Sequence, residues 1–129
     1  TRQRGHSTPR PLTLHESAAP LDHITKHQLV RGDVRETAHR YFAEHPETVV
    51  ALAYFDLDLY EPTAAALRAV QPYLTRSSLL VFDEPNCPEF PGETIALRDV
   101  FGLNGMQLQR SPLHPWIAYA PADFLVSKP

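Results

Sequence analysis

Apolar residues along this chain alternate between short uninterrupted runs and a spacing of three and four residues. Uninterrupted runs over 49–55 and 78–82 predict strands buried on both faces. The wider spacing predicts helices over about 34–45, 62–74 and 93–101. A short strand over 28–30 precedes the first helix, and strands near 106–110 and 116–120 follow the last. This order predicts a doubly wound α/β fold, a partial Rossmann-like sheet with helices on both faces and a C-terminal antiparallel hairpin.

Boundary residues support these helices. Asp33, with Glu36 three residues further on, resembles a capping arrangement for the first helix, and Pro46 ends it. Pro62 falls in the first turn of the second helix, where its missing N–H costs nothing. Gly102 ends the third helix. Residues 1–22 carry no such period, so we expect a flexible arm there and one α/β domain over 23–129.

Composition narrows the function classes. The chain of 129 residues has a net charge of −3, and no lysine or arginine cluster repeats along one predicted helix face, which argues against a nucleic-acid partner. The single Cys87 has no internal disulfide partner. No apolar run approaches the roughly 18 residues that span a bilayer, and no secretory signal is visible. These features predict a cytoplasmic protein without a membrane partner.

Two predicted strands end in closely spaced acids. Asp56 and Asp58 follow the strand over 49–55, and Asp83 and Glu84 follow the strand over 78–82. Parallel strands bring their carboxyl ends to the same edge of a sheet, so we expect the four carboxylates to lie near one another. Grouped carboxylates repel one another unless a cation, a shared proton or a bound substrate compensates. A divalent metal such as Mg²⁺ is the simplest compensator.

The sequence around these acids resembles a known family. The segments are Gly32-Asp33 before a helix, Tyr54-Phe-Asp-Leu-Asp-Leu-Tyr-Glu-Pro-Thr63, Phe82-Asp-Glu-Pro-Asn86 and Pro91-Gly-Glu-Thr94. Together they resemble the macrocin O-methyltransferase (TylF-like) family of sugar methyltransferases, within the class I S-adenosylmethionine-dependent enzymes. The resemblance spans roughly residues 24–122.

The resemblance implies a Mg²⁺-assisted methyl transfer from S-adenosylmethionine to a sugar or other hydroxyl compound. It implies metal binding by Asp56, Asp83 and Glu84, with Asp58 as a further ligand. Glu84 stands where aspartate is more usual in the family. Asp56, at the strand terminus, is also the candidate general base. Asp33 matches the region that lies beside the adenine of the cofactor.

Three aromatic or imidazole side chains are candidates to contact the substrate. Tyr60 and Trp116 are positioned to line a pocket at the sheet end, although the alternative is that they merely plug it. His114, between Pro112 and Trp116, is a candidate to reach the same edge from the hairpin, and an ordinary loop histidine is the alternative.

One expected feature of such an enzyme is missing. The five glycines, at 5, 32, 92, 102 and 105, include no Gly-x-Gly pair for a cofactor-binding turn. The chain therefore resembles the C-terminal half of a methyltransferase. In the strand order that the resemblance implies, 3-2-1-4-5-7-6, the absent strands would leave an apolar edge exposed. We expect either a homo-oligomer or a complementing N-terminal half.

Other readings stay open at this point. One of Asp56 and Asp58 is alternatively the cap of the helix that starts at Pro62, with the other a solvated acid. Asp33 is alternatively an ordinary helix cap. A strand ending in Asp-x-Asp is also the nucleophile signature of haloacid dehalogenase-type aspartyl phosphatases, although Leu59 replaces the small residue expected there. The third alternative is a non-catalytic methyltransferase remnant that acts as an interaction module.

Overall fold

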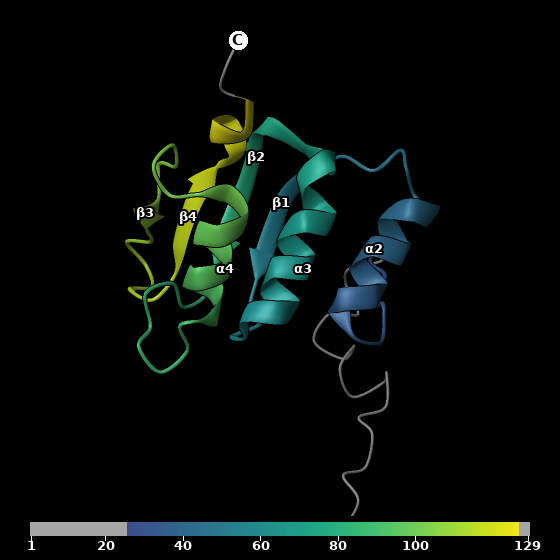
Figure 1. The fold of residues 1–129 in the computed structure, drawn as a ribbon. Coiled ribbons are helices and arrows are strands. Elements are labelled where there is room, and N and C mark those ends of the chain that lie inside the picture. The colour runs from purple at the N-terminus through teal and green to yellow at the C-terminus, as the bar shows by residue number, and fades with distance from the viewer. Residues whose placement is uncertain (1–25, 127–129) are drawn as a thin grey trace, which may run out of the picture. The chain divides into compact units, whose positions relative to one another are not determined.

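The computed structural model describes residues 26–126, and the chain from Arg31 onward forms one compact unit. Figure 1 shows its helices and strands, which follow the predicted order except for the strand expected over 28–30. They are α2 (Val34–Glu44), β1 (Val50–Phe55), α3 (Tyr60–Val70), β2 (Leu74–Phe82), α4 (Gly92–Phe101), β3 (Gln109–Arg110) and β4 (Ala118–Pro121), with short 3-10 helices η2 (Gln71–Tyr73) and η3 (Ala122–Val126). The predicted arm over 1–22 lies outside the described residues.

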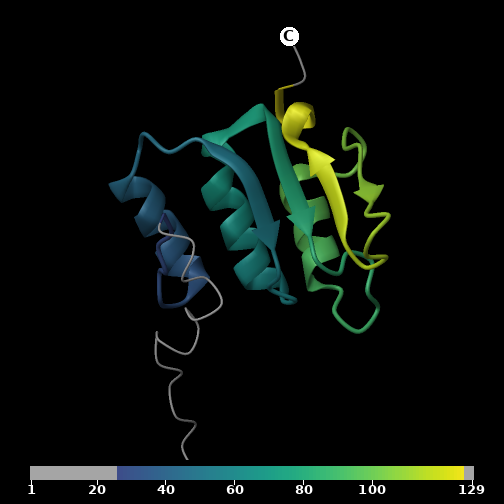
Figure 2. The ribbon, with the colours of Figure 1, turned by 180° about the vertical axis from the view of Figure 1, so that it is seen from behind.

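The four strands form one sheet in the order β1-β2-β4-β3 (Figure 2). β1 and β2 are parallel, and α3 forms the connection between them. β4 runs antiparallel to β2 and to β3, which confirms the predicted C-terminal hairpin. β1 has a hydrogen-bonded partner on one side only, so its other side is a free edge among the described residues.

The core lies between the sheet and the helices α3 and α4, which cover the same face (Figures 1 and 2). Phe55 and Phe82 point into it from adjacent strands, with their ring centroids 5.2 Å apart in a stacked arrangement. Leu67 of α3 and Leu97 of α4 meet them there and are fully buried. Burial of four such side chains, at about 1.5–3 kcal/mol each, fixes the two helices on this face.

The opposite face of β1 differs from the prediction. Leu52 is 56% exposed and Tyr54 is 49% exposed, so the strand is not buried on both faces. No helix of the described residues covers this face (Figure 2). A continuous apolar run is normally the mark of a strand covered on both sides. Within residues 26–126 no helix or strand provides such a cover for this face of β1.

The strand predicted over 28–30 is also wrong, because those residues form neither helix nor strand. An extended segment becomes a strand only when a neighbouring strand takes its hydrogen bonds. Within residues 26–126 the sheet contains only β1, β2, β4 and β3, and none of them pairs with this segment.

The helix predicted to reach residue 74 ends at Val70 and continues as the short η2. Pro72 explains the change, because it has no backbone N–H and its ring clashes with the preceding turn of an α-helix. Leu74, predicted on the buried stripe of that helix, instead begins β2. Separately, none of the helices within 26–126 has the length and apolar character of a membrane span.

Candidate active site

The predicted acids lie where β1 and β2 end, at what we call the carboxyl edge of the sheet. Phe55 pairs with Phe82 in the parallel register, so Asp56 and Asp83 are the next residues on neighbouring strands. The backbone N–H of Asp83 donates to the carbonyl of Phe55 at 3.0 Å. Adjacent strands lie about 4.8 Å apart, so the register places the backbones of the two acids side by side.

Tyr54 reaches across the two strands to one of these acids. Its hydroxyl donates a hydrogen bond to Oδ1 of Asp83. That hydrogen bond, together with the nearby negative charge, raises the pKa of Tyr54 to about 12. The phenol therefore remains protonated at physiological pH and occupies one oxygen of Asp83.

Glu93 joins the two strand ends from the other side. This carboxylate is on the first turn of α4 and is only 2% exposed. Its Oε1 accepts from the backbone N–H of Leu57 at 3.1 Å, and its Oε2 accepts from that of Glu84 at the longer distance of 3.5 Å. Burial raises the pKa of Glu93, the two backbone hydrogen bonds lower it, and the charges of Asp58 and Asp56 raise it further.

The loop after β1 contains a tight turn centred on Asp58. The N–H of Leu59 donates to the carbonyl of Leu57 at 2.5 Å, and Asp58 adopts a positive φ of 57°. A non-glycine residue in this region is uncommon and often marks a functional site. Gly92 packs directly against the turn, because a Cβ on it would lie 2.3 Å from the carbonyl oxygen of Asp58. The start of α4 and this loop therefore form one tightly fitted unit.

These contacts do not assemble a metal site. Within residues 26–126, no three His, Cys, Asp or Glu side chains are grouped in a way that could hold a metal ion. The Asp83 carboxylate is hydrogen-bonded to Tyr54, and Glu93 directs both oxygens to backbone N–H groups. The described side chains, as placed, therefore do not fit the predicted Mg²⁺ ion, and the arrangement does not support the ligand set Asp56, Asp58, Asp83 and Glu84.

Asp33 lies at the start of α2 and acts as its N-cap. Its carboxylate accepts from the backbone N–H of Arg35 at 2.9 Å and from the Arg35 guanidinium. The side-chain hydrogen bond from Arg35 is the main reason that the pKa of Asp33 falls to about 2. The ordinary capping role considered for Asp33 is thus present in the structure. The acids after β1 do not cap α3, since its N-cap is Leu59 and no side chain bonds there.

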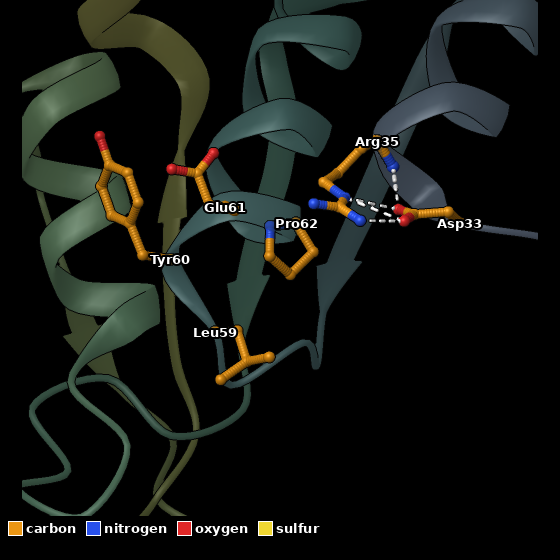
Figure 3. A pocket seen from close by; sticks show the side chains of 6 residues that line it. All are labelled: Asp33, Arg35, Leu59, Tyr60, Glu61 and Pro62. Atoms are coloured by element: carbon orange, nitrogen blue, oxygen red, sulfur yellow. Dashed lines mark hydrogen bonds and ion pairs between the residues drawn. The ribbon is translucent and has the colours of Figure 1, made fainter.

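Asp33 and Arg35 also form one wall of an open cavity of about 560 Å³. The other wall is the loop and first turn of α3, residues Leu59, Tyr60, Glu61 and Pro62. Figure 3 shows the Asp33–Arg35 pair facing Pro62, while the Tyr60 ring points away from that pair. Tyr60 also packs against the core. The cavity therefore combines an ion pair on one wall with apolar residues and the Glu61 carboxylate on the other.

The other two candidate substrate residues lie in the link before β4. Ala118 pairs with Phe82, so the link ends at the carboxyl edge of β2. His114 and Trp116 are exposed there, Trp116 by 56%. The carbonyl of Pro115 accepts a hydrogen bond from Arg110 at 2.6 Å, which ties the link to β3. The topology thus brings both residues to the same edge as the acids.

Sequence reasoning did not identify Tyr54, Gly92 or Glu93 as parts of this site. Tyr54 is hidden inside an apolar run, which predicts core packing. Glu93 stands in the first turn of a helix, where an acid is explained by the helix dipole alone. The sequence did contain one signal for this part of the site. Gly92 and Glu93 begin a helix in a chain that has two acidic strand ends.

Comparison with solved structures identifies proteins to which this chain is similar. The chain is similar to the apo structure of CalS11, a TDP-rhamnose 3′-O-methyltransferase of calicheamicin biosynthesis, with 57% identity and a TM-score of 0.70. A second structure of CalS11, described as the calicheamicin methyltransferase, gives the same identity and TM-score. Each match covers 73% of this chain but only 40% or 37% of the CalS11 chain. No family model and no curated protein matches.

The two CalS11 structures agree with the α/β architecture and with the resemblance of the sequence to O-methyltransferases. The chain spans less than half the length of that protein. We conclude that this chain is a relative of the O-methyltransferases and corresponds to part of such an enzyme.

Proposed function

We propose that this chain forms the acceptor-side part of an S-adenosylmethionine-dependent O-methyltransferase of the TylF-like sugar methyltransferases. The observation that carries the proposal is the 57% identity with CalS11, an enzyme that methylates TDP-rhamnose. We therefore propose a sugar hydroxyl, carried on a nucleotide, as the acceptor. The two acid-bearing loops lie at one edge of the sheet. Ligands of α/β folds bind at the carboxyl ends of the strands, so this edge is the expected place of the reaction.

The chemistry requires a base. When it is bound, S-adenosylmethionine supplies an electrophilic methyl group, and the bond from that methyl carbon to sulfur breaks so that S-adenosylhomocysteine is left. The acceptor hydroxyl must give up its proton as its oxygen forms the new bond to that methyl group. We assign the proton to the carboxylate of Asp56, which is exposed directly after β1. A positioned base of this kind contributes about 10²–10⁴-fold to a rate. No step is assigned to a metal ion.

We propose that the 560 Å³ cavity beside Asp33 receives the cofactor's adenine end. Its apolar wall at Leu59 and Pro62 suits a flat ring, and Asp33 offers carboxylate oxygens to an exocyclic amine. Arg35 already holds this carboxylate, so the amine must share it. His114 and Trp116 stay proposed acceptor contacts from the hairpin side, and Tyr60 from the loop side.

The sequence has no Gly-x-Gly pair for the cofactor-binding turn. We propose that a complementing half of a methyltransferase, which carries such a turn, docks at the free edge of β1. That edge and the adjacent open face carry exposed apolar residues, among them Val49, Leu52 and Tyr54. A free apolar strand edge is a ready template for a further strand.

A chimera provides the test. This chain is joined to the part of CalS11 that it does not match, and transfer of labelled methyl from S-adenosylmethionine to TDP-rhamnose is measured. We expect the chimera to be active and Asp56→Asn to lower kcat about 10²-fold or more. The control is Asp99→Asn, which removes an exposed carboxylate on α4 whose ion-pair partner within residues 26–126 is Arg98.

A chimera that folds and binds S-adenosylmethionine but methylates no sugar nucleotide would contradict the proposed acceptor. A folded chimera that does not bind S-adenosylmethionine would favour the interaction-module alternative. Release of phosphate from a generic ester would favour the phosphatase, which the comparisons do not support.

A further inference from the structure

Glu93 is the most deeply buried acid at the carboxyl edge and makes contact with both strand-end loops. One carboxylate oxygen accepts from the backbone N–H of Leu57, which lies between Asp56 and Asp58. The other accepts from the backbone N–H of Glu84, which directly follows Asp83. The two partners belong to loops that follow different strands. A single side chain therefore bridges the two acid-bearing loops.

Only a carboxylate can make this bridge at full strength. Both partners are backbone N–H donors, so the bridging group must accept at two separate oxygens. A glutamine of the same shape offers one oxygen and one NH₂ group, and the NH₂ group would face a second donor. An alanine offers nothing, and it would leave two N–H groups without this partner.

The position of Glu93 carries an electrostatic cost. Burial and the neighbouring Asp58 and Asp56 all disfavour its charged form. Hydrogen bonds to the two N–H groups offset part of this cost. Gly92 allows the approach, because its missing side chain leaves room for the Asp58 turn against α4. Gly92 and the two backbone N–H donors together allow an acid at a position where burial alone would disfavour it.

We propose that Glu93 is a positioning residue that fixes the Asp56–Asp58 loop and the Asp83–Glu84 loop relative to each other before substrate binds. Its consequence for methyl transfer rests on the proposed function, while its effect on loop geometry does not. A displacement of about 1 Å in a positioned group can cost about 10²-fold in rate, so fixing this geometry is a specific contribution.

Backbone amide exchange tests the geometric claim in the folded chain. In the unsubstituted protein we expect the N–H groups of Leu57 and Glu84 to exchange at least tenfold more slowly than in unstructured peptides. In Glu93→Gln one of the two should lose this protection, and in Glu93→Ala both should. The amide of Val81, inside the sheet, should keep its protection in both variants.

The outcome that overturns the proposal is clear. If neither loop amide is protected in the unsubstituted protein, Glu93 does not hold the loops, and this result needs no variant to fold. If both amides stay protected in a folded Glu93→Ala, the bridge is irrelevant to loop geometry and the proposal is equally wrong.

Kinetics on the active chimera test the catalytic consequence. We expect Glu93→Gln to lower kcat at least tenfold per folded molecule while the KM for S-adenosylmethionine stays within about twofold. Asp99→Asn on the same helix should change neither. A purely structural role would lower the folded fraction and leave kcat per folded molecule intact. If no acceptor is methylated at all, the proposed function fails, and the amide exchange still decides whether Glu93 positions the loops.

Discussion

The hydroxyl of Tyr54 on β1 donates a hydrogen bond to the carboxylate of Asp83, the first residue after β2. The pair lies on the sheet face opposite the buried rings of Phe55 and Phe82. It therefore connects the open face of the sheet to the carboxyl edge. A tyrosine that sequence analysis assigns to a buried strand becomes a polar neighbour of the site.

The pKa of Tyr54 gives a direct prediction for this pair. The hydrogen bond to Asp83 and the surrounding negative charge raise it to about 12, above its ordinary value near 10. Stability from this contact should be present below about pH 10 and decline as the pH rises through about 12. Ultraviolet titration of phenolate absorbance should show one late-ionising tyrosine. Asp83→Asn should move it toward 10, and a titration unchanged by that variant would contradict the assignment.

Gly92 is expected to tolerate no side chain. A Cβ would lie 2.3 Å from the carbonyl oxygen of Asp58 and 2.5 Å from the N of Tyr60, both backbone atoms that cannot rotate away. Gly92→Ala should lower the free energy of unfolding by roughly 3 kcal/mol, the upper end of the usual cost of overpacking. Urea denaturation measures it. Gly105→Ala is the matched control, since its Cβ would meet nothing closer than 3.6 Å.

Ser78 should be a stability determinant of the sheet. Its fully buried hydroxyl donates to the carbonyl of Val50 at 2.5 Å and accepts from the N–H of Thr75 at 2.7 Å. These bonds lie at the register shift between β1 and β2. Ser78→Ala should cost about 1–3 kcal/mol, because it removes a partner from two backbone groups. The exposed neighbour Ser77 gives the control: Ser77→Ala should stay within about 0.5 kcal/mol.

The α2 cap should depend on pH. The Arg35 hydrogen bonds lower the pKa of Asp33 from 3.8 to about 2. A lowered folded-state pKa means that the stabilisation is complete above about pH 4 and is lost as the pH falls toward 2. Asp33→Asn keeps a capping oxygen without the charge. The difference in the free energy of unfolding between the two proteins should therefore narrow as the pH falls from about 4 to 2 in denaturation experiments. A constant gap would contradict the ionic contribution of this cap.

Local patterns were sufficient where neighbours in sequence decide the outcome. Asp33 and Pro46 bound α2 as predicted, and Gly102 follows the last residue of α4. Pro72 was the local signal that prediction overlooked, since it turns the end of α3 into a 3-10 helix. The hairpin of β3 and β4 also follows from its short link.

The order of elements along the chain, the acidic ends of two strands and the likeness to O-methyltransferases were all readable from the residues alone, because helix periods, apolar runs and motifs are local. Tertiary structure decided what pairs and what packs. The segment over 28–30 pairs with no described strand, and one face of β1 is exposed. Tyr54 donates a hydrogen bond to Asp83. Glu93 accepts from the loop after β1, and Gly92 packs against that loop. Such contacts depend on residues tens of positions apart, and no local pattern encodes the distance between them.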